Sequence, residues 1–276
     1  QLLDRAAARR REPRLECQAA LYSPSTGIID SHGLMLGLEA DAERHGATIA
    51  LRSKVTAGEI RDDGFVLDVE SPGSEYYRLG CNVLVNAAGL GARAFALALA
   101  GFPADRVPRL YYAKGCFYAL TGAPPFRHLV VPMGQALTDS GAFTLDLAGY
   151  ARFGPDRVEW VEEDRDYSVA PDRAAAFARA IRTYYPELDE RRIHPSYAGI
   201  RPGTSPGEPL GDWVIEGPEQ HGIENLVHMF AIESPGLTAS LALADYALDA
   251  LKKSSLPSRG RGKGERARVR RERDQC

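Results

Sequence analysis

One short segment of this sequence has the residue types that let a ligand lie directly against the backbone. It spans residues 83–91, VLVNAAGLG, in which an apolar strand passes into Ala87, Ala88 and Gly89 and then into a short helix. Small residues at such a turn admit a bulky ligand, with the N–H groups of the helix facing it. As a dinucleotide fingerprint G-x-G-x-x-G the segment is defective, because Ala94 stands where the third glycine is needed. A tight strand–helix turn without a ligand is the alternative interpretation.

A second segment suits an anionic ligand. It spans residues 230–240, FAIESPGLTAS, where a strand breaks at Ser234, Pro235 and Gly236 and a helix is expected to begin at once. Pro and Gly ahead of a helix leave its first N–H groups unobstructed, so the positive end of the helix dipole points at whatever faces the break. A phosphate, a carboxylate or a reduced flavin would be stabilised there. The alternative is that Ser234 or Thr238 caps a core helix.

Arg201 and His32 are the side chains best suited to act on a substrate. Arg201 ends an apolar strand, and Pro202 holds it in an extended backbone from which its guanidinium can grip a carboxylate at two points. His32 stands at an expected helix start, as a base or as a polar capping residue. A surface or salt-bridged arginine is the alternative for Arg201. The histidines show neither H-x-x-x-H nor H-E-x-x-H spacing and no G-x-S-x-G elbow occurs, so we expect neither a metal site nor a serine hydrolase.

The first part of the chain is expected to mix helices and strands. A helix follows Asp30 and Ser31, either of which can cap it, with Leu34, Leu38 and Ala42 on one face and Gly46 closing it. The sequence Asp62-Asp63-Gly64 predicts a hairpin turn. The other elements expected here are strands at residues 47–53, 59–61, 65–70, 76–79 and 81–86 and a helix at residues 92–100.

From Arg109 the sequence becomes rich in strands. A helix at residues 172–184 interrupts them, with Phe177 and Ile181 on one face. The expected strands cover residues 109–120, 129–131, 142–147, 150–153, 158–161, 193–200 and 226–231. The last helix has one stripe of apolar residues at a period of 3.6, made of Leu237, Leu241, Ala244, Leu248 and Leu251. This pattern predicts an α/β (α+β) fold with an antiparallel sheet inserted at residues 109–198.

Length and charge narrow the class of protein. The 276 residues, 44% hydrophobic and 26% charged, fit one large domain or two small ones and exclude a disordered chain. The longest nearly apolar run, residues 95–102, is far shorter than the roughly 20 residues that cross a bilayer. Ten of the 34 Lys and Arg and three of the 37 Asp and Glu lie in residues 252–276, which leaves residues 1–251 with a net charge of −10. We therefore expect a disordered basic tail at 252–276 and no nucleic acid on the folded body.

Cysteine usage and the first residues bear on the compartment. Four cysteines lie far apart without a C-x-x-C pair, which favours reduced thiols in the cytoplasm. Residues 1–14 are rich in arginine but have no apolar run of the signal-peptide type. A mitochondrial transit fragment is the alternative for them, against which Asp4 and Glu12 count.

Taken in order, these pieces resemble the FAD-dependent oxidoreductases of the D-amino-acid-oxidase (DAO) type, and within them the L-2-hydroxyglutarate dehydrogenase/oxidase group. The likeness covers residues 15–251, and it rests on the order and spacing of several motifs more than on any one of them. The matching segments are YSPSTGIIDSH at 22–32, NAAG at 86–89, Lys114-Gly115 with Tyr118, TLDL at 144–147, ARFGP at 151–155, GIRP at 199–202 and IESPGLTAS at 232–240.

The resemblance implies a flavin site. Ala87, Ala88 and Gly89 would pack on FAD, Val55 would lie beside its adenine, and Gly199 would carry Arg201 to the flavin and the substrate. Residues Ser234, Pro235, Gly236, Leu237 and Thr238 would face the flavin pyrimidine, where a helix N-terminus stabilises the negative charge that hydride arrival leaves. We expect the corners near positions 88 and 235 to converge on one cleft the size of an isoalloxazine.

The resemblance also implies a domain plan and a reaction. Residues 15–108 and 199–251 would be the remaining part of an FAD-binding, Rossmann-like domain, and residues 109–198 the roof over the substrate. A small 2-hydroxy acid similar to L-2-hydroxyglutarate would lose hydride from its α-carbon to flavin N5. Arg201 and Lys114 would clamp its carboxylate, Tyr118 would contact it, and His32 or Arg201 would serve in catalysis, His32 as the base.

The sequence departs from the family pattern at three places. It has no G-x-G-x-x-G strand–turn–helix and no acidic residue to hold a ribose, so we expect the chain to begin after the half of the site that cradles the pyrophosphate. Ser140-Gly141-Ala142 stands where Gly-Val-His is usual, and Gly203 stands where a Lys is usual. Two alternatives therefore stay open: an amine, amino-acid or glycerol-3-phosphate type of oxidase, and a truncated, non-catalytic remnant that binds no FAD.

Overall fold

The structure is a computed structural model, and it describes residues 1–71, 73, 75–133, 141–155, 159–161, 166–206 and 211–253. Its chain contacts divide it into two compact units. Unit 1 joins Gln1–Ile49 with Tyr112–Ile200, and unit 2 joins Ala50–Tyr111 with Arg201–Cys276. The predicted change of domain near residues 109 and 198 falls close to two of these boundaries, whereas residues 15–49 group with unit 1. The roles given to the two parts stay predictions.

Unit 1 opens with a folded N-terminal segment. Strands β1 (Leu2–Asp4) and β2 (Ala19–Leu21) pair antiparallel, and helix α1 (Arg5–Arg11) between them is capped by Asp4, whose carboxylate accepts from Ala7 N. The Glu12 carboxylate is almost fully buried and accepts hydrogen bonds from the backbone N–H groups of Arg127 and His128, each at 2.8 Å. Leu3, Ala8 and Glu12 are thus buried in this unit while most of residues 1–14 are exposed, and the interpretation of these residues as a transit fragment stays a prediction.

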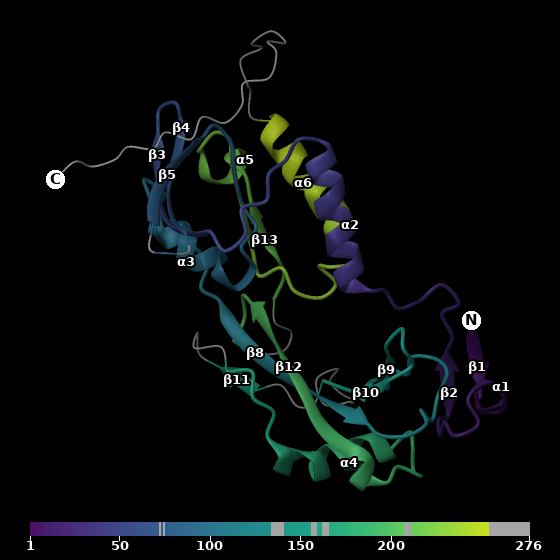
Figure 1. Ribbon diagram of the computed structural model, residues 1–276. Helices are drawn as coiled ribbons and strands as arrows, with labels where there is room; N and C mark the ends of the chain where they lie inside the picture. The colour runs from purple at the N-terminus through teal and green to yellow at the C-terminus, as the bar shows by residue number, and fades with distance from the viewer. Residues whose placement is uncertain are drawn as a thin grey trace. The chain divides into compact units, whose positions relative to one another are not determined.

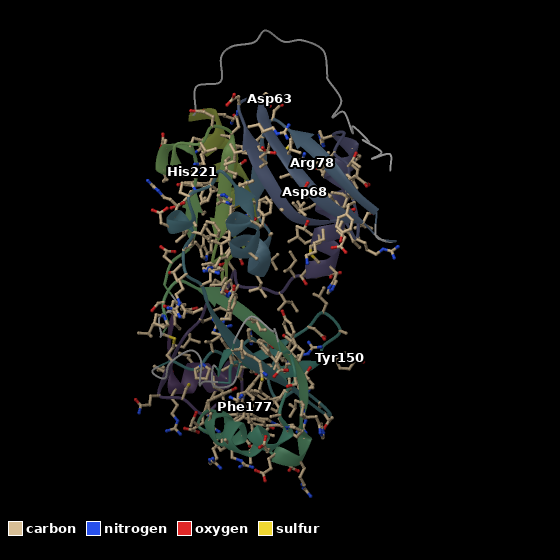
Figure 2. All side chains as sticks on the ribbon, turned by 90° about the vertical axis from the view of Figure 1, so that its left-hand side faces the viewer. Asp63, Asp68, Arg78, Tyr150, Phe177 and His221 are labelled. Atoms are coloured by element: carbon tan, nitrogen blue, oxygen red, sulfur yellow. The ribbon has the colours of Figure 1, made fainter. Side chains whose placement is uncertain are left out.

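A five-stranded sheet forms the rest of unit 1 (Figure 1). Four of its strands follow the order β11 (Glu159–Val161), β8 (Tyr111–Leu120), β10 (Ala151–Phe153) and β9 (Phe143–Leu145), each antiparallel to its neighbour, and β12 (Ile193–Gly203) also pairs with β8. Helix α4 (Ala174–Arg182) buries Phe177, labelled in Figure 2, and Ile181 in an aromatic core with Tyr118 and Phe143. The antiparallel sheet and the buried face of α4 are confirmed.

Helix α2 (Ser31–Arg44) also falls in unit 1. Asp30 caps it by accepting from His32 N and Gly33 N, and Gly46 follows its end with a φ of 91°, as expected. None of its residues is buried in the part of the chain that the structure describes. The remaining short helices of this unit are η3 (Pro171–Arg173) and η4 (Glu190–Arg192).

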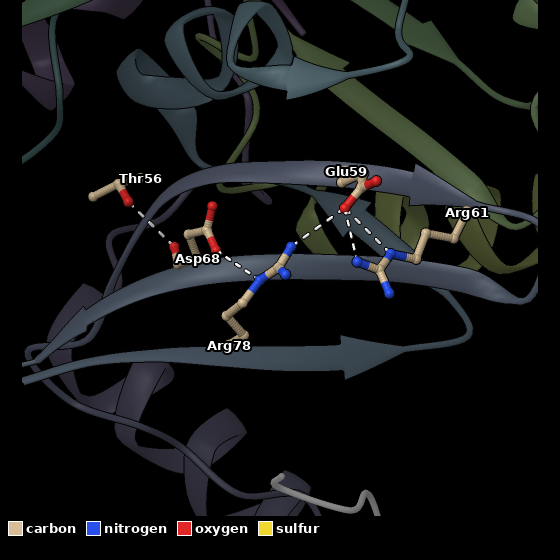
Figure 3. A network of polar contacts seen from close by, with 5 residues as sticks. All are labelled: Thr56, Glu59, Arg61, Asp68 and Arg78. Atoms are coloured by element: carbon tan, nitrogen blue, oxygen red, sulfur yellow. Dashed lines mark hydrogen bonds and ion pairs between the residues drawn. The ribbon is translucent and has the colours of Figure 1, made fainter. Parts of the chain in front are cut away.

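Unit 2 contains a four-stranded sheet in the order β5 (Glu75–Cys81), β4 (Gly64–Ser71), β3 (Lys54–Arg61) and β7 (Leu99–Ala100). The predicted hairpin joins β3 to β4, and charged side chains cross one face of the sheet (Figure 3). Arg78 reaches Asp68 at 3.1 Å and Glu59 at 3.3 Å, and Arg61 reaches Glu59 at 3.0 Å. The strand expected at residues 47–53 is wrong: among the described residues nothing pairs with it, and Arg52 has a φ of 55°, outside the strand region.

The second sheet of unit 2 has three strands, in the order β13 (Val214–Glu216), β14 (Leu226–Phe230) and β6 (Leu84–Asn86). Around it lie η1 (Gly89–Gly91), α3 (Ala92–Leu97), η2 (Ala104–Arg106) and α5 (Pro218–His221). The strand expected at 81–86 is shorter, because Cys81 already ends β5.

Helix α6 (Ser240–Lys253) covers one side of β14, where Val227 and Met229 pack with Ala247 and Leu251. The predicted apolar stripe is wrong apart from Leu251, because Leu237, Leu241 and Leu248 are half exposed or more. Lys252 and Lys253 belong to this helix, and the rest of the expected tail lies outside the described residues.

No helix in the described ranges has the length and apolar character needed to cross a membrane.

Candidate functional site

Strands β6 and β14 bring the two predicted corners to one edge of a sheet. They run parallel, with Leu84 opposite Leu226 and Asn86 opposite His228. Because parallel neighbours end at the same edge, residues 87–89 (the first corner) and residues 231–238 (the second corner) leave the sheet there together. Ligands of open α/β sheets bind outside the carboxyl ends of such strands. The parallel pairing supports the expected convergence of the two corners, which stays a prediction together with the flavin-sized cleft.

The first corner consists of small, exposed residues, and a buried side chain fixes its backbone. Ala87, Ala88 and Gly89 are exposed, and Gly89 has a φ of 57° with nothing within 4 Å of the position a Cβ would take. The buried Asn86 side chain fixes them: its Oδ1 accepts from Ala88 N at 3.3 Å, and its Nδ2 donates to Ala92 O at 2.9 Å. The helix after this corner, α3, is only six residues long.

His228 completes the support of the first corner. It is fully buried, and its Nδ1 lies 2.9 Å from Asn86 Nδ2. Nδ2 is a donor, so Nδ1 accepts and the imidazole is neutral with its proton on Nε2. Burial lowers the pKa of His228 to about 4, with a smaller contribution from His221. A neutral amide and a neutral imidazole therefore lie directly under the corner.

The second corner is held by Glu233. Its Oε2 accepts from Ser234 N at 2.7 Å, and its carbonyl accepts from Gly236 N at 2.5 Å. A Cβ on Gly236 would lie 2.7 Å from that carbonyl oxygen, so only glycine fits this turn. The helix expected to begin directly after Gly236 begins at Ser240 instead, because residues 234–239 form turns first. Pro235, Leu237 and Thr238 thus lie in the turn and not in the helix.

Arg201 belongs to the second corner through an ion pair. Its Nη1 lies 3.6 Å from Glu233 Oε2, and a third of its side chain is exposed. One guanidinium nitrogen is engaged by this contact, and a guanidinium has five N–H donors. Arg201 therefore brings a positive charge beside Ser234 and keeps donors for an anion.

The predicted site residues of unit 1 differ in burial: some are buried and already hydrogen-bonded, and others are exposed. The Lys114 ammonium is buried and donates to Asp166 at 2.8 Å, which lowers the pKa of that carboxyl to about 2. Tyr118 has no exposed surface, and its hydroxyl donates to Ala170 O at 3.1 Å, so its predicted contact with a substrate has no support in this geometry. His32 is exposed on the first turn of α2, and Gly199 is half buried in β12.

Two further positions complete the predicted set. Val55 lies in β3, opposite Val69 and just over a third exposed, and its place beside an adenine stays a prediction. Of the altered motif at 140–142, Ser140 lies outside the described residues. Within the described ranges no group of three or more His, Cys, Asp and Glu is placed to hold a metal ion.

Sequence reasoning missed the residues that hold the corners, Asn86, His228 and Glu233. A signal existed for the first two, since each is a polar residue inside or at the end of an otherwise apolar strand. Glu233 directly precedes the Ser-Pro-Gly break, but the sequence does not reveal that its carboxylate pairs with Arg201.

Comparison with known proteins agrees with this arrangement. Residues 1–250 match the DAO family of FAD dependent oxidoreductases. The chain belongs to this family. It is 38% identical over 283 residues to the L-2-hydroxyglutarate dehydrogenase, mitochondrial, of Arabidopsis thaliana, covering 89% of this chain and 58% of that protein. It is 23% identical to a glycerol 3-phosphate dehydrogenase of Caloramator mitchellensis, covering 85% of this chain and 46% of that one.

Solved structures of other enzymes share the fold. The L-alpha-glycerophosphate oxidase of Mycoplasma pneumoniae, solved with FAD bound, superimposes with a TM-score of 0.71 at 18% identity, covering 91% of this chain and 64% of that one. The L-proline dehydrogenase of P. horikoshii does so with a TM-score of 0.72 at 13% identity, covering 93% and 65%. The predicted mixed α/β fold is therefore confirmed. The chain spans about half the length of the curated relatives it matches.

The described residues fit the cofactor of this family at the sheet edge. Three exposed small residues and an open Gly89 leave the backbone of the first corner accessible to a flat ring system. The second corner adds Arg201, a cation half enclosed by its ion pair. An edge of this kind can accept an aromatic group carrying an anion.

Proposed function

We propose that this chain provides the flavin-facing part of an FAD-dependent dehydrogenase or oxidase that acts on a small 2-hydroxy acid. The observation that carries the proposal is the parallel register of β6 and β14, which brings the two corners to one sheet edge. Family membership supports FAD as the cofactor. Bound FAD would supply the hydride acceptor for oxidation at the substrate α-carbon.

The residues of the two corners would bind and orient the cofactor. Ala87, Ala88 and Gly89 offer backbone and no bulky side chain, so a ring can approach closely. Ser234, Pro235, Gly236, Leu237 and Thr238 would border the ring on its other side. Their turn is kept in shape by the Glu233 hydrogen bonds.

Arg201 would hold the substrate carboxylate. A carboxylate and Arg201 form charge-assisted hydrogen bonds that are strongest where water is partly excluded, and Arg201 is two-thirds covered. His32 is proposed as the base that takes the hydroxyl proton while the α-hydrogen leaves as hydride. Its exposed imidazole in the structure is compatible with proton exchange with solvent.

Lys114 is the second cation proposed for a carboxylate, and its role depends on Asp166. An incoming carboxylate would have to replace Asp166 as the partner of the ammonium. Such an exchange would make Lys114 selective for dianionic substrates, because a weakly charged ligand would not displace a carboxylate already in place.

The identity of the relative narrows the substrate. The Arabidopsis protein is named for L-2-hydroxyglutarate, and we propose a hydroxy acid of this class for the whole protein to which this chain belongs. The same name includes a mitochondrial location, so the mitochondrion is the proposed compartment and the cytoplasm the alternative predicted from the cysteines.

The test is flavin binding followed by substrate reduction. Residues 1–276 are expressed, FAD is titrated, and the visible flavin absorbance of the purified protein is recorded together with its thermal stability. A yellow protein that FAD stabilises, and whose colour bleaches anaerobically with L-2-hydroxyglutarate, would support the proposal for this chain. A colourless protein without thermal response to FAD would support the remnant interpretation for this chain.

Two controls make the test specific. Glycerol 3-phosphate and sarcosine are offered in the same bleaching assay, and faster reduction by either would replace the hydroxy-acid assignment by an oxidase of that type. Arg201→Lys keeps the charge but loses the planar fork. We expect it to raise KM for the hydroxy acid about tenfold or more with FAD binding retained.

A further inference from the structure

We propose that His228 and Asn86 act as one positioning pair, in which the neutral imidazole of His228 accepts the second amide hydrogen of Asn86 and thereby helps Asn86 hold the backbone of the flavin-facing first corner. This inference rests on the proposed function for its consequence in FAD binding. Its structural part stands on unit 2 alone and is tested separately below.

The Asn86 side chain forms hydrogen bonds to three segments. Its amide touches Ala88 in the corner, Ala92 at the start of α3, and His228 on the neighbouring strand. Both Nδ2 hydrogens and one lone pair of Oδ1 are used, so the amide has a single orientation that satisfies every contact. Ala92 O and Ala88 N already require the NH₂ group and the oxygen on their present sides, so the second Nδ2 hydrogen points at His228 and its Nδ1 must accept.

His228 is itself held in one orientation. Its ring stacks on Phe230 with centroids 5.2 Å apart and meets the edge of Phe102 at 4.5 Å. As the middle residue of β14 it stands opposite Asn86 on β6 and Glu216 on β13. Val227 and Met229, on the other side of the strand, pack toward α6, which keeps His228 on the Phe102 side of the sheet.

Burial and the neighbouring His221 favour a neutral imidazole at His228. His221 on α5 lies with its ring 6.2 Å from that of His228, and burial lowers its pKa as well. Glu216 is a neighbour on the same face of the sheet, and burial raises the pKa of its carboxyl. Arg106, on η2, donates to Gln220 O at 2.6 Å and adds a positive charge near His221. Protonation of His228 on Nδ1 would place N–H against N–H at Asn86, so the corner depends on the neutral form.

The pair makes the corner sensitive to a single hydrogen-bond acceptor. Loss of the acceptor at position 228 leaves a donor of Asn86 buried and unpaired, which costs more than the bond itself contributes. The Asn86 side chain is then held only by Ala92 O and Ala88 N, and the long contact with Ala88 N weakens as the side chain shifts. A flavin that packs on Ala87, Ala88 and Gly89 would meet a shifted backbone.

The first experiment needs no cofactor. The protein is labelled with ¹⁵N at its histidine residues only and is studied by NMR. The nitrogen chemical shifts distinguish the two neutral tautomers and the imidazolium of each ring. We expect His228 to be the Nε2–H tautomer at neutral pH. In Asn86→Asp, where a carboxylate replaces the donor, we expect its titration to move up by at least about one pH unit. An Nδ1–H tautomer in the native protein would overturn the pairing.

The second experiment measures the amide hydrogen exchange of the first corner and the affinity for FAD in a matched set of variants. His228→Leu removes the acceptor at nearly the same volume. His228→Asn restores an acceptor near the position of Nδ1. His221→Leu makes the same change at the other buried histidine of the cluster, which has no bond to Asn86.

We expect Ala88 N–H exchange about tenfold faster and FAD binding at least about tenfold weaker in His228→Leu, with both largely recovered in His228→Asn. His221→Leu should lower stability without either effect. If FAD affinity falls equally in the two leucine variants, His228 contributes only to core packing, and the proposal is overturned. If the native protein binds no FAD, the exchange and tautomer results still decide the pairing, and the proposed function alone fails.

Discussion

The two corners of the candidate site are held by different physical means. The first corner rests on Asn86 and His228, both buried and both uncharged. The second rests on Glu233 and Arg201, a carboxylate and a guanidinium that keep contact with solvent. Both anchors stand at the end of parallel neighbours in one sheet, so strand geometry alone does not account for the difference.

The difference fits what each corner is proposed to do. A surface that packs on a ring must keep its shape, and buried neutral hydrogen bonds are strong and little affected by salt because water does not compete for them. A surface that meets a charged substrate needs a charge that can pair with the substrate, and an ion pair that is partly exposed can rearrange to allow this. Each anchor can be broken separately, and the consequences should differ in size and in their response to pH and salt.

The largest effect is expected at Asn86. Asn86→Leu leaves Ala88 N, Ala92 O and His228 Nδ1 without their partner in a buried place. We expect a loss of about 3 kcal/mol in the free energy of unfolding, measured by urea denaturation. The loss should be the same in low and in molar salt. A loss below about 1 kcal/mol would mean that solvent reaches the amide and that the first corner is not held from a dry interior.

The pH dependence should single out the first corner. The pKa of His228 is about 4 in the folded protein against 6.5 for an ordinary histidine. Between these two pH values the unfolded chain therefore binds a proton at this residue and the folded chain does not. The free energy of unfolding should therefore fall as pH drops from about 6.5 to about 4, by up to about 3 kcal/mol from this residue. The lowered pKa of His221 acts in the same direction.

Single-site variants separate the two histidines in this pH window. His228→Leu should flatten the stability profile between these pH values more than His221→Leu does. Above pH 7 the profile of the native protein should be level with respect to both residues. A native profile that is flat from pH 6.5 to 4 would show that His228 takes up its proton without disturbing the fold.

The strand that leads into each corner could be predicted from the sequence because it follows from local signals, whereas the convergence of the two corners was implied only by the family resemblance. Each corner is an apolar run that ends in small or turn-forming residues, and each run reads as a buried strand. The hairpin at Asp62-Asp63-Gly64 and the buried face of α4 follow from equally local patterns. The family resemblance supplied the order of the pieces and the cofactor.

The rest depended on contacts between distant residues. Asn86 and His228 are 142 positions apart, and no local pattern pairs them. The stripe of leucines on α6 has a clear helical period, yet the side that packs is the one facing Val227 and Met229, which the sequence of the helix does not indicate. Tyr118 lies in β8 as expected, but the sequence of the strand does not say which of its two faces becomes the core. That is decided by packing against α4 and its neighbours, which bury Tyr118.

A smaller effect is expected from closing the turn of the second corner. In Gly236→Ala the new Cβ would lie 2.7 Å from Glu233 O and 2.8 Å from Ile232 Cγ2, so the backbone must move. We expect a loss of about 2 kcal/mol in stability and weaker FAD binding. Gly80→Ala is the control, because it lies in β5 with open space at the Cβ position and should cost almost nothing. Equal stability of the two variants would mean that residues 234–239 adjust freely.

The smallest effect is expected from the ion pair itself. Glu233→Gln keeps an acceptor for Ser234 N but removes the charge that faces Arg201. We expect a loss of about 1 kcal/mol in low salt that shrinks in molar salt, measured by urea denaturation at both concentrations. The substrate KM should change more than kcat, since Arg201 loses the group that aims it.

Arg78→Ala supplies the baseline for that measurement. Arg78 pairs with Asp68 and Glu59 on the open face of the β3–β4–β5 sheet, where about half of each side chain is exposed (Figure 3). Exposed pairs of this kind contribute little, so its melting temperature should stay within about 2 °C of the native value. If Glu233→Gln behaves like Arg78→Ala in both salt conditions, the second corner has no anchor of its own. A salt-dependent loss at Glu233 alone would show that partial enclosure gives this ion pair its strength, between the dry contacts of Asn86 and the open contacts of Arg78.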